Sequence, residues 1–121
     1  NVMGEAIAEI ALRPDRYERA LAKARADGLR NFGRLDDFIA RMPELEWHRP
    51  QGGLIGLAKL TTGLTGNEFA RRLLAEPYRT FLIPGSAYGC PDHIRLGVGG
   101  GDLAGLDNGL NRIAALLETL R

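Results

Sequence analysis

The sequence predicts an α+β domain in which a small, mostly antiparallel sheet is covered on one face by helices. Apolar residues recur at helical spacing near both ends of the chain, and short strand-like runs bounded by glycine and proline lie between them. The expected order is helix, helix, strand, strand, helix, strand, strand, helix. This order favours one layer of helices packed on one sheet. At 121 residues without a dividing linker, residues 1–121 are expected to form a single domain.

The first part of the chain, residues 1–43, is expected to be a helical lead-in. Residues 2–12 carry apolar side chains at three-to-four spacing, which predicts an amphipathic helix. A second helix is expected to begin with Asp15 as its N-cap. The spacing leaves open whether this helix ends at Gly28 or continues to Pro43, where the ring must stop it.

The second part, residues 44–121, is expected to be an α/β sandwich. In this part the period of the apolar residues changes, and turn-forming glycines and prolines become frequent. The expected elements are strands at 45–47 and 53–60, a helix from the N-cap Asn67 to about Glu76, strands at 80–83 and 93–98, a break at Gly99–Gly101, and a helix capped by Asp102.

Composition excludes several classes of partner. Sixteen basic and fifteen acidic residues are interspersed and give a net charge of +1, which favours neither nucleic acid nor an anionic membrane. No apolar run approaches the roughly 20 residues of a membrane span. The single cysteine, Cys90, excludes an intrachain disulfide and indicates a reducing cytoplasm. The chain opens without an initiator methionine; a start at Met3 and a cut from a longer protein fit equally well.

The familiar metal and nucleophile patterns are weak. His48 and His93 lie far apart without clustered carboxylates, whereas a zinc site needs three or four ligands at close spacing. Cys90 is interpreted as an ordinary free cysteine, because a reactive thiolate needs a basic partner or a helix N-terminus. The run Gly99–Gly101 lacks the following Gly-Lys-Ser/Thr of a phosphate-binding loop and is interpreted as a turn.

Arg95 is the residue that stands out. Strand geometry sends its neighbours Ile94 and Leu96 to one face and Arg95 to the other. A guanidinium group on a stiff strand is a well-oriented fork for a carboxylate. On these residues alone, an ordinary surface arginine remains the simpler interpretation.

The surroundings of Arg95 carry a family resemblance. The segment Pro84–Gly89 followed by Ile94–Gly97 resembles the C-terminal signature of class I/II pyridoxal-phosphate-dependent (PLP-dependent) aminotransferases. Those enzymes typically have a Pro-Gly-x-x-Phe-Gly loop and then a strand with Ile-Arg-Leu. Upstream, Pro50–Leu54 resembles their Pro-x-Gly-Gly-aromatic segment, and Asn31–Leu35 resembles their Asn-Arg-x-x-Leu helix segment. The resemblance covers nearly the whole chain, in the right order.

The resemblance implies that the chain is the C-terminal small domain of a longer aminotransferase, an enzyme of amino acid metabolism. Its cofactor, PLP, would be bound mainly by a large domain of the same protein, which would also supply the Schiff-base lysine. Neither Lys23 nor Lys59 matches that lysine, so this chain alone is expected to be inactive. The implied partners are the large domain, an amino acid or 2-oxo acid substrate, and a second copy in a full-length homodimer.

The resemblance also implies a set of substrate-binding residues. Arg95 matches the arginine that pairs with the substrate α-carboxylate, and Gly53, Ser86 and Tyr88 lie in the segments that would line the site. Tyr88 departs from the usual phenylalanine. No catalytic, cofactor-binding or metal-binding residue is carried over.

Two other functions stay open. One is a sister PLP chemistry on the same fold, in a lyase, a decarboxylase or an acyl-transferring synthase. The other is a stand-alone α+β binding module without catalysis. A longer reading frame that supplies a Ser-x-x-Lys segment would favour the PLP enzymes over the module.

Overall fold

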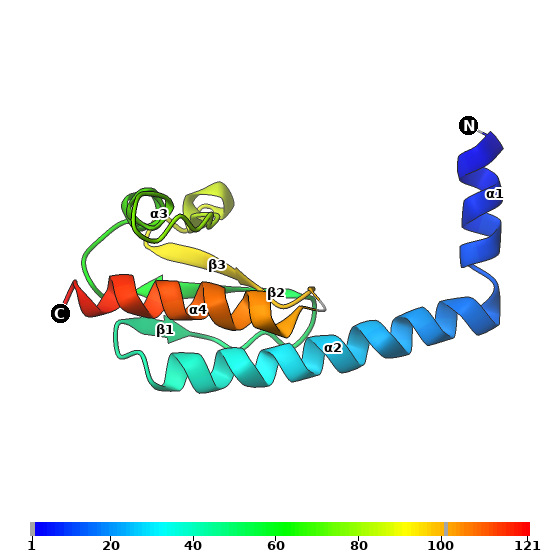
Figure 1. The fold of residues 1–121 in the computed structure, drawn as a ribbon, viewed down its shortest axis with the longest axis horizontal. Coiled ribbons are helices and arrows are strands. Elements are labelled where there is room, and N and C mark those ends of the chain that lie inside the picture. The colour runs from blue at the N-terminus through cyan, green and yellow to red at the C-terminus, as the bar shows by residue number, and fades with distance from the viewer. Residues whose placement is uncertain (1, 101) are drawn as a thin grey trace.

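The computed structural model describes residues 2–100 and 102–121. This part of the chain forms four α-helices, one short 3-10 helix and a sheet of three antiparallel strands, which confirms the predicted α+β class (Figure 1). In chain order the elements are α1 (Val2–Ala11), α2 (Pro14–Ala40), β1 (Leu45–Trp47), β2 (Ile55–Leu60), α3 (Gly66–Leu74), η1 (Gly85–Tyr88), β3 (His93–Gly97) and α4 (Leu103–Glu118).

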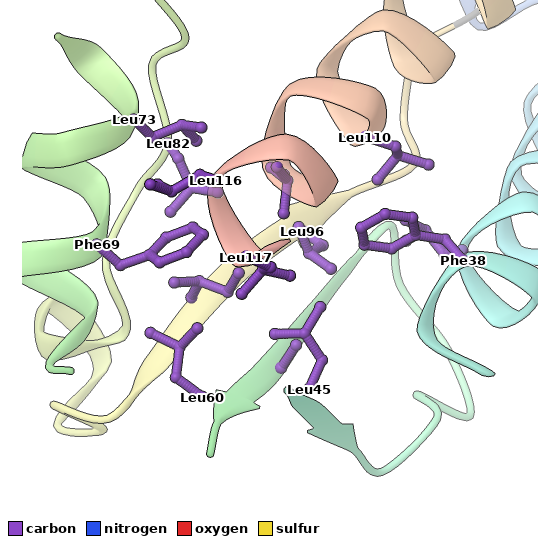
Figure 2. Close-up of a cluster of buried hydrophobic side chains, with 14 of the residues drawn as sticks. Phe38, Leu45, Leu60, Phe69, Leu73, Leu82, Leu96, Leu110, Leu116 and Leu117 are labelled. Atoms are coloured by element: carbon purple, nitrogen blue, oxygen red, sulfur yellow. The ribbon is translucent and has the colours of Figure 1, made fainter. Parts of the chain in front are cut away.

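The sheet has the order β1-β2-β3, and one of its faces is covered by helices. On that face Leu45 lies opposite Leu60 and Ala58 lies opposite Ile94, and all four side chains are buried. Helices α2, α3 and α4 pack on these side chains (Figure 2). The helical residues that point into this core include Phe38, Phe69, Leu73, Leu110, Leu116 and Leu117. The opposite face of the sheet is left open by these helices.

Helix α2 resolves the question that the spacing left open. It continues through Gly28, which is buried so closely against the loop before β2 that a Cβ there would lie 3.2 Å from Leu54 Cδ2. The prediction of Asp15 as the N-cap was wrong. Pro14 occupies the first helical position, where its missing N–H costs nothing. Asp15 therefore lies inside the first turn, and its carboxylate pairs with Arg19 one turn later at 2.9 Å.

Helix α3 begins two residues earlier than predicted. The N-cap is Thr65 and not Asn67: the Thr65 hydroxyl accepts from the Glu68 backbone N–H at 3.2 Å, and the Glu68 carboxylate accepts from the Thr65 N–H at 2.9 Å. This capping box satisfies two backbone donors, which a cap at Asn67 would leave without partners. The helix also ends at Leu74, before the predicted limit near Glu76.

The prediction of a strand at 80–83 was wrong. These residues, all within the described part, run beside β3 as irregular chain. They contact it through the Arg95 N–H, which donates to the Ile83 carbonyl at 2.9 Å, and through an isolated bridge between Pro84 and Ile94. A strand needs a continued ladder of such bonds, and one isolated bridge does not supply it.

The last helix fits its prediction more closely. Asp102 occupies the N-cap position of α4, and the apolar stripe of that helix contributes Leu110, Ile113 and Leu117 to the core. The predicted strand 93–98 is β3, one residue shorter. The break predicted at Gly99–Gly101 includes Gly101, which lies outside the described residues.

An arm projects from the body of the molecule. It consists of α1 and the N-terminal half of α2 (Figure 1, blue). The predicted helix at 2–12 is thus confirmed, but its apolar side chains stay exposed, with Val2 at 83% and Ile7 at 63%. Within residues 2–100 and 102–121, no helix is both long enough and apolar enough to cross a bilayer.

Candidate functional site

The candidate site is built around Arg95 in the middle of β3. Its neighbours Ile94 and Leu96 are 0% and 5% exposed on the helix-covered face, so Arg95 lies on the open face, as predicted. Leu57 is its cross-strand partner, and the next pair on this face is Lys59 and His93. The strand therefore presents the guanidinium group to solvent from a rigid support.

Tyr88 joins Arg95 from a different segment. An Arg95 Nη1–H donates to the Tyr88 hydroxyl at 2.7 Å. The guanidinium carbon also lies 6.0 Å from the centre of the Tyr88 ring. Two predicted site residues, seven positions apart in the sequence, are thus in direct contact.

The turn that carries Tyr88 is held tightly against β3. The Cys90 N–H donates to the Gly85 carbonyl at 3.0 Å, and Gly89 ends η1 with a positive φ of 75°. Gly85 approaches so closely that a Cβ there would lie 2.6 Å from His93 Cβ. This packing needs glycine at position 85, and it fixes where Tyr88 stands relative to the strand.

Helix α3 supports the same turn. The Gly66 N–H donates to the Pro91 carbonyl at 2.7 Å. Ser86, another predicted site residue, donates its hydroxyl proton to Asn67 Oδ1 at 3.1 Å. Sequence reasoning missed this role of Asn67, because the residue was interpreted as a helix cap. No local signal identifies the contact, since it joins side chains 19 residues apart.

Gly53 lies apart from this group. It adopts a positive φ of 80° in the loop between β1 and β2. That loop and α2 line a separate hollow of about 680 Å³, whose walls include Arg25, Leu29, Phe32 and Arg49. The structure therefore brings together Arg95 and Tyr88, places Ser86 in the same short helix as Tyr88, and sets Gly53 beyond the end of β3.

The charged groups around Arg95 leave its guanidinium group available to bind an anionic ligand. Five other arginines that the structure describes are paired with carboxylates, as Arg49 is with Asp36 at 2.7 Å. Arg95 has no acidic partner among the residues that the structure describes. Asp92, just before β3, already has a partner, because the hydrogen bond with His93 lowers the pKa of Asp92. Arg95 is thus a cation that still has free N–H donors.

The potential metal ligands and the single cysteine were also located in the part of the chain that the structure describes. There, His, Cys, Asp and Glu side chains form no group of three or more that would hold a metal ion. The Cys90 thiol contacts the Tyr88 carbonyl at 3.7 Å and is partly buried.

The three-dimensional arrangement matches known enzymes. A PLP-dependent aminotransferase from Streptococcus suis superposes on 99% of this chain with a TM-score of 0.90 and 24% identity. The chain has the fold of the small domain of PLP-dependent aminotransferases. The PLP-dependent cyclase OrfR matches 97% of this small domain with a TM-score of 0.84 and 27% identity. An aromatic aminotransferase from Pyrococcus horikoshii matches 92%, with a TM-score of 0.80 and 23% identity.

The small domain spans about a third of the length of these enzymes, because it covers 31%, 32% and 30% of the three chains. No protein-family model and no curated protein matches the sequence.

The residues of this small domain do not by themselves fit a PLP site. Its two lysines are Lys23 and Lys59. Lys23 pairs with Asp27 at 2.5 Å on a solvent-facing side of α2, and Lys59 is exposed on the sheet. Neither has the secluded, desolvated surroundings that tune a lysine for Schiff-base chemistry.

Proposed function

We propose that this chain is the small domain of a longer PLP-dependent aminotransferase, and that Arg95 binds the α-carboxylate of the amino acid or 2-oxo acid substrate. The observation that carries the proposal is the state of Arg95. It stands on the open face of a rigid strand, held by Tyr88, with free N–H donors and without an acidic partner in the described chain.

The role of Arg95 follows from the shape of its side chain. A guanidinium fork binds a carboxylate through two parallel N–H···O bonds, which fix both its position and its plane. A substrate held in this way has lost most of its freedom before any bond changes, and this orientation lowers the barrier of the later step. PLP, when bound by the rest of the enzyme, supplies the electron sink. This chain supplies the arginine that fixes the position and orientation of the substrate.

The other predicted site residues have supporting roles in this proposal. Ser86, tied to Asn67 at 3.1 Å, would keep the η1 turn at the mouth of the site. Gly53 would shape the loop before β2, because its φ of 80° is strained for any residue with a Cβ.

The exposed arm supports the existence of a further domain. Val2, Met3, Ile7 and Leu12 are between 63% and 83% exposed, and they lie on the arm that projects from the body. Clustered apolar surface of this kind marks an interface that another protein surface covers. In the proposal that surface belongs to the large domain of the same protein.

The test is performed on the protein encoded by the longer reading frame, purified with PLP. We expect the absorbance band of bound PLP, and we expect an amino acid to shift it. Arg95→Ala should raise the KM for the amino acid about 100-fold, because losing a charge pair at a desolvated site costs a few kcal/mol. Arg71→Ala, on the exposed side of α3, is the control and should leave KM unchanged. An unchanged KM in Arg95→Ala would refute the carboxylate role.

A second candidate is a different PLP chemistry on the same fold. It is favoured by the match to the cyclase OrfR, which has the highest sequence identity of the three structures at 27%. Product analysis separates the two. Transfer of the amino group to a 2-oxo acid supports the aminotransferase, whereas a product that keeps or eliminates the amino group supports the sister chemistry. Absence of both PLP and amino acid binding would favour the stand-alone module.

A further inference from the structure

We propose that Tyr88 is a positioning residue: its hydroxyl holds the Arg95 guanidinium in an orientation that leaves its Nε–Nη2 edge free for a carboxylate. The inference rests on the proposed function of Arg95. It gives Tyr88 the role of holding Arg95 instead of the role of contacting the substrate.

The contact is specific to a tyrosine. The hydroxyl accepts from Arg95 Nη1–H at 2.7 Å, while the ring lies 6.0 Å from the guanidinium carbon. Tyr88 is 47% exposed, so neither the ring nor the hydroxyl is needed to fill the core. A phenylalanine at this position would keep the ring contact but would lose the acceptor. The hydroxyl therefore acts on Arg95 and adds little to the packing of the domain.

The support for Tyr88 is rigid. The η1 turn is closed by the hydrogen bond from the Cys90 N–H to the Gly85 carbonyl and packs against His93 at a distance that only glycine allows. Strand β3 fixes the other end, at the Arg95 backbone. The hydrogen bond between Tyr88 and Arg95 thus links two stiff supports and removes rotational freedom from the long arginine side chain.

The hydrogen bond to Tyr88 determines which N–H donors of Arg95 remain free. The guanidinium group has five N–H donors in a fixed plane. One donor at Nη1 is used by Tyr88, and the Nε and Nη2 donors make no hydrogen bond with residues 2–100 or 102–121. These two donors lie side by side and point in the same direction, as bidentate binding requires. An arginine already held in this orientation loses less entropy when it binds a carboxylate, so the affinity is higher.

The test compares Tyr88→Phe with Tyr17→Phe in the full-length enzyme. Tyr17 is half-exposed on α2 and is the matched control for loss of a hydroxyl. Tyr88→Phe should raise the KM for the amino acid about tenfold, the size of one hydrogen bond to a charged group, and should change kcat less than about threefold. Tyr17→Phe should change neither. Equal effects of the two variants would overturn the proposal.

A second measurement detects directly, without enzyme turnover, whether Tyr88 restrains the Arg95 guanidinium group. Side-chain ¹⁵N NMR of the Arg95 guanidinium should show slow rotation of its Nη groups in the natural protein and fast rotation in Tyr88→Phe. Unchanged rotation would overturn the proposal.

A double-variant cycle separates the proposal from the function on which it rests. In an Arg95→Ala background, Tyr88→Phe should raise KM no further, because it acts through Arg95. If it raises KM by the same tenfold there, Tyr88 acts on the substrate or the fold, and the proposal fails. If Arg95→Ala itself leaves KM unchanged, the proposed function fails. If Arg95→Ala raises KM but Tyr88→Phe does not, the function stands and the positioning role fails.

Discussion

Gly66 is the position where the packing behind the candidate site is most sensitive to a single methyl group. A Cβ at Gly66 would lie 2.1 Å from the His93 carbonyl oxygen, whereas real Cβ contacts essentially never fall below 3.0 Å. Gly66→Ala must therefore push the start of α3 and the start of β3 apart by about 0.9 Å. His93 and Arg95 lie on the same short strand, so the displacement reaches the site.

The magnitude follows from two costs and one gain. Overpacking costs about 1–3 kcal/mol. The hydrogen bond from the Gly66 N–H to the Pro91 carbonyl, 2.7 Å long, is stretched or lost, which costs about 1–3 kcal/mol for a buried backbone group. Replacing glycine by alanine in a helix returns up to about 1 kcal/mol. The free energy of unfolding should therefore fall by about 1–6 kcal/mol.

Urea denaturation of the purified chain, followed by circular dichroism, measures this change. With a slope of about 2 kcal/mol per molar urea, in the middle of the usual range, the unfolding midpoint should fall by about 0.5–3 M. Gly33→Ala is the matched control, because Gly33 is an exposed helical glycine whose Cβ would have no atom within 4 Å. That variant should raise the free energy of unfolding by about 0.5–1 kcal/mol. A similar rise in Gly66→Ala would refute the argument from close approach.

Two further predictions concern stability. Leu117→Ala should lower the free energy of unfolding by about 2–5 kcal/mol, because Leu117 is 0% exposed at the centre of the core, and a smaller loss in thermal or urea unfolding would indicate that the cavity collapses. The hydrogen bond from Arg121 holds the pKa of Glu44 below its ordinary value of 4.5, so this pair should stabilise the fold fully above pH 4.5 and progressively less as the pH falls through the lower folded-state pKa. Unfolding profiles of Glu44→Gln should lack this part of the acid sensitivity, and profiles identical to those of the natural chain would contradict the assignment.

Elements that depend on local pattern were predictable from the sequence. The apolar spacing of α1 and α4 and the alternation of Ile94, Arg95 and Leu96 are properties of a single segment, so they indicate helices, a strand and the face of each side chain without knowledge of the partners. Alternation gave only the face on which Arg95 lies, whereas its candidate role came from the resemblance of the neighbouring motif to a known family.

Features that depend on a partner elsewhere in the chain required the tertiary structure. Residues 80–83 carry strand-like residues, yet a strand exists only where a neighbour completes its ladder, and here an isolated bridge between Pro84 and Ile94 forms beside them in place of a ladder. The helix-like spacing before Pro43 contains Gly28, and only its packing against Leu54 explains why α2 continues there.

The sequence by itself determined the fold class, because period and alternation are properties of local order. It selected Arg95 through the resemblance of the neighbouring motif to a known family. The tertiary structure alone decided what surrounds that arginine. It brought Tyr88 to 2.7 Å from the guanidinium group, tied Ser86 to Asn67, and set Gly53 in a separate hollow. These contacts depend on how β3, η1 and α3 pack together, and glycines 66 and 85 permit that packing only because they have no Cβ.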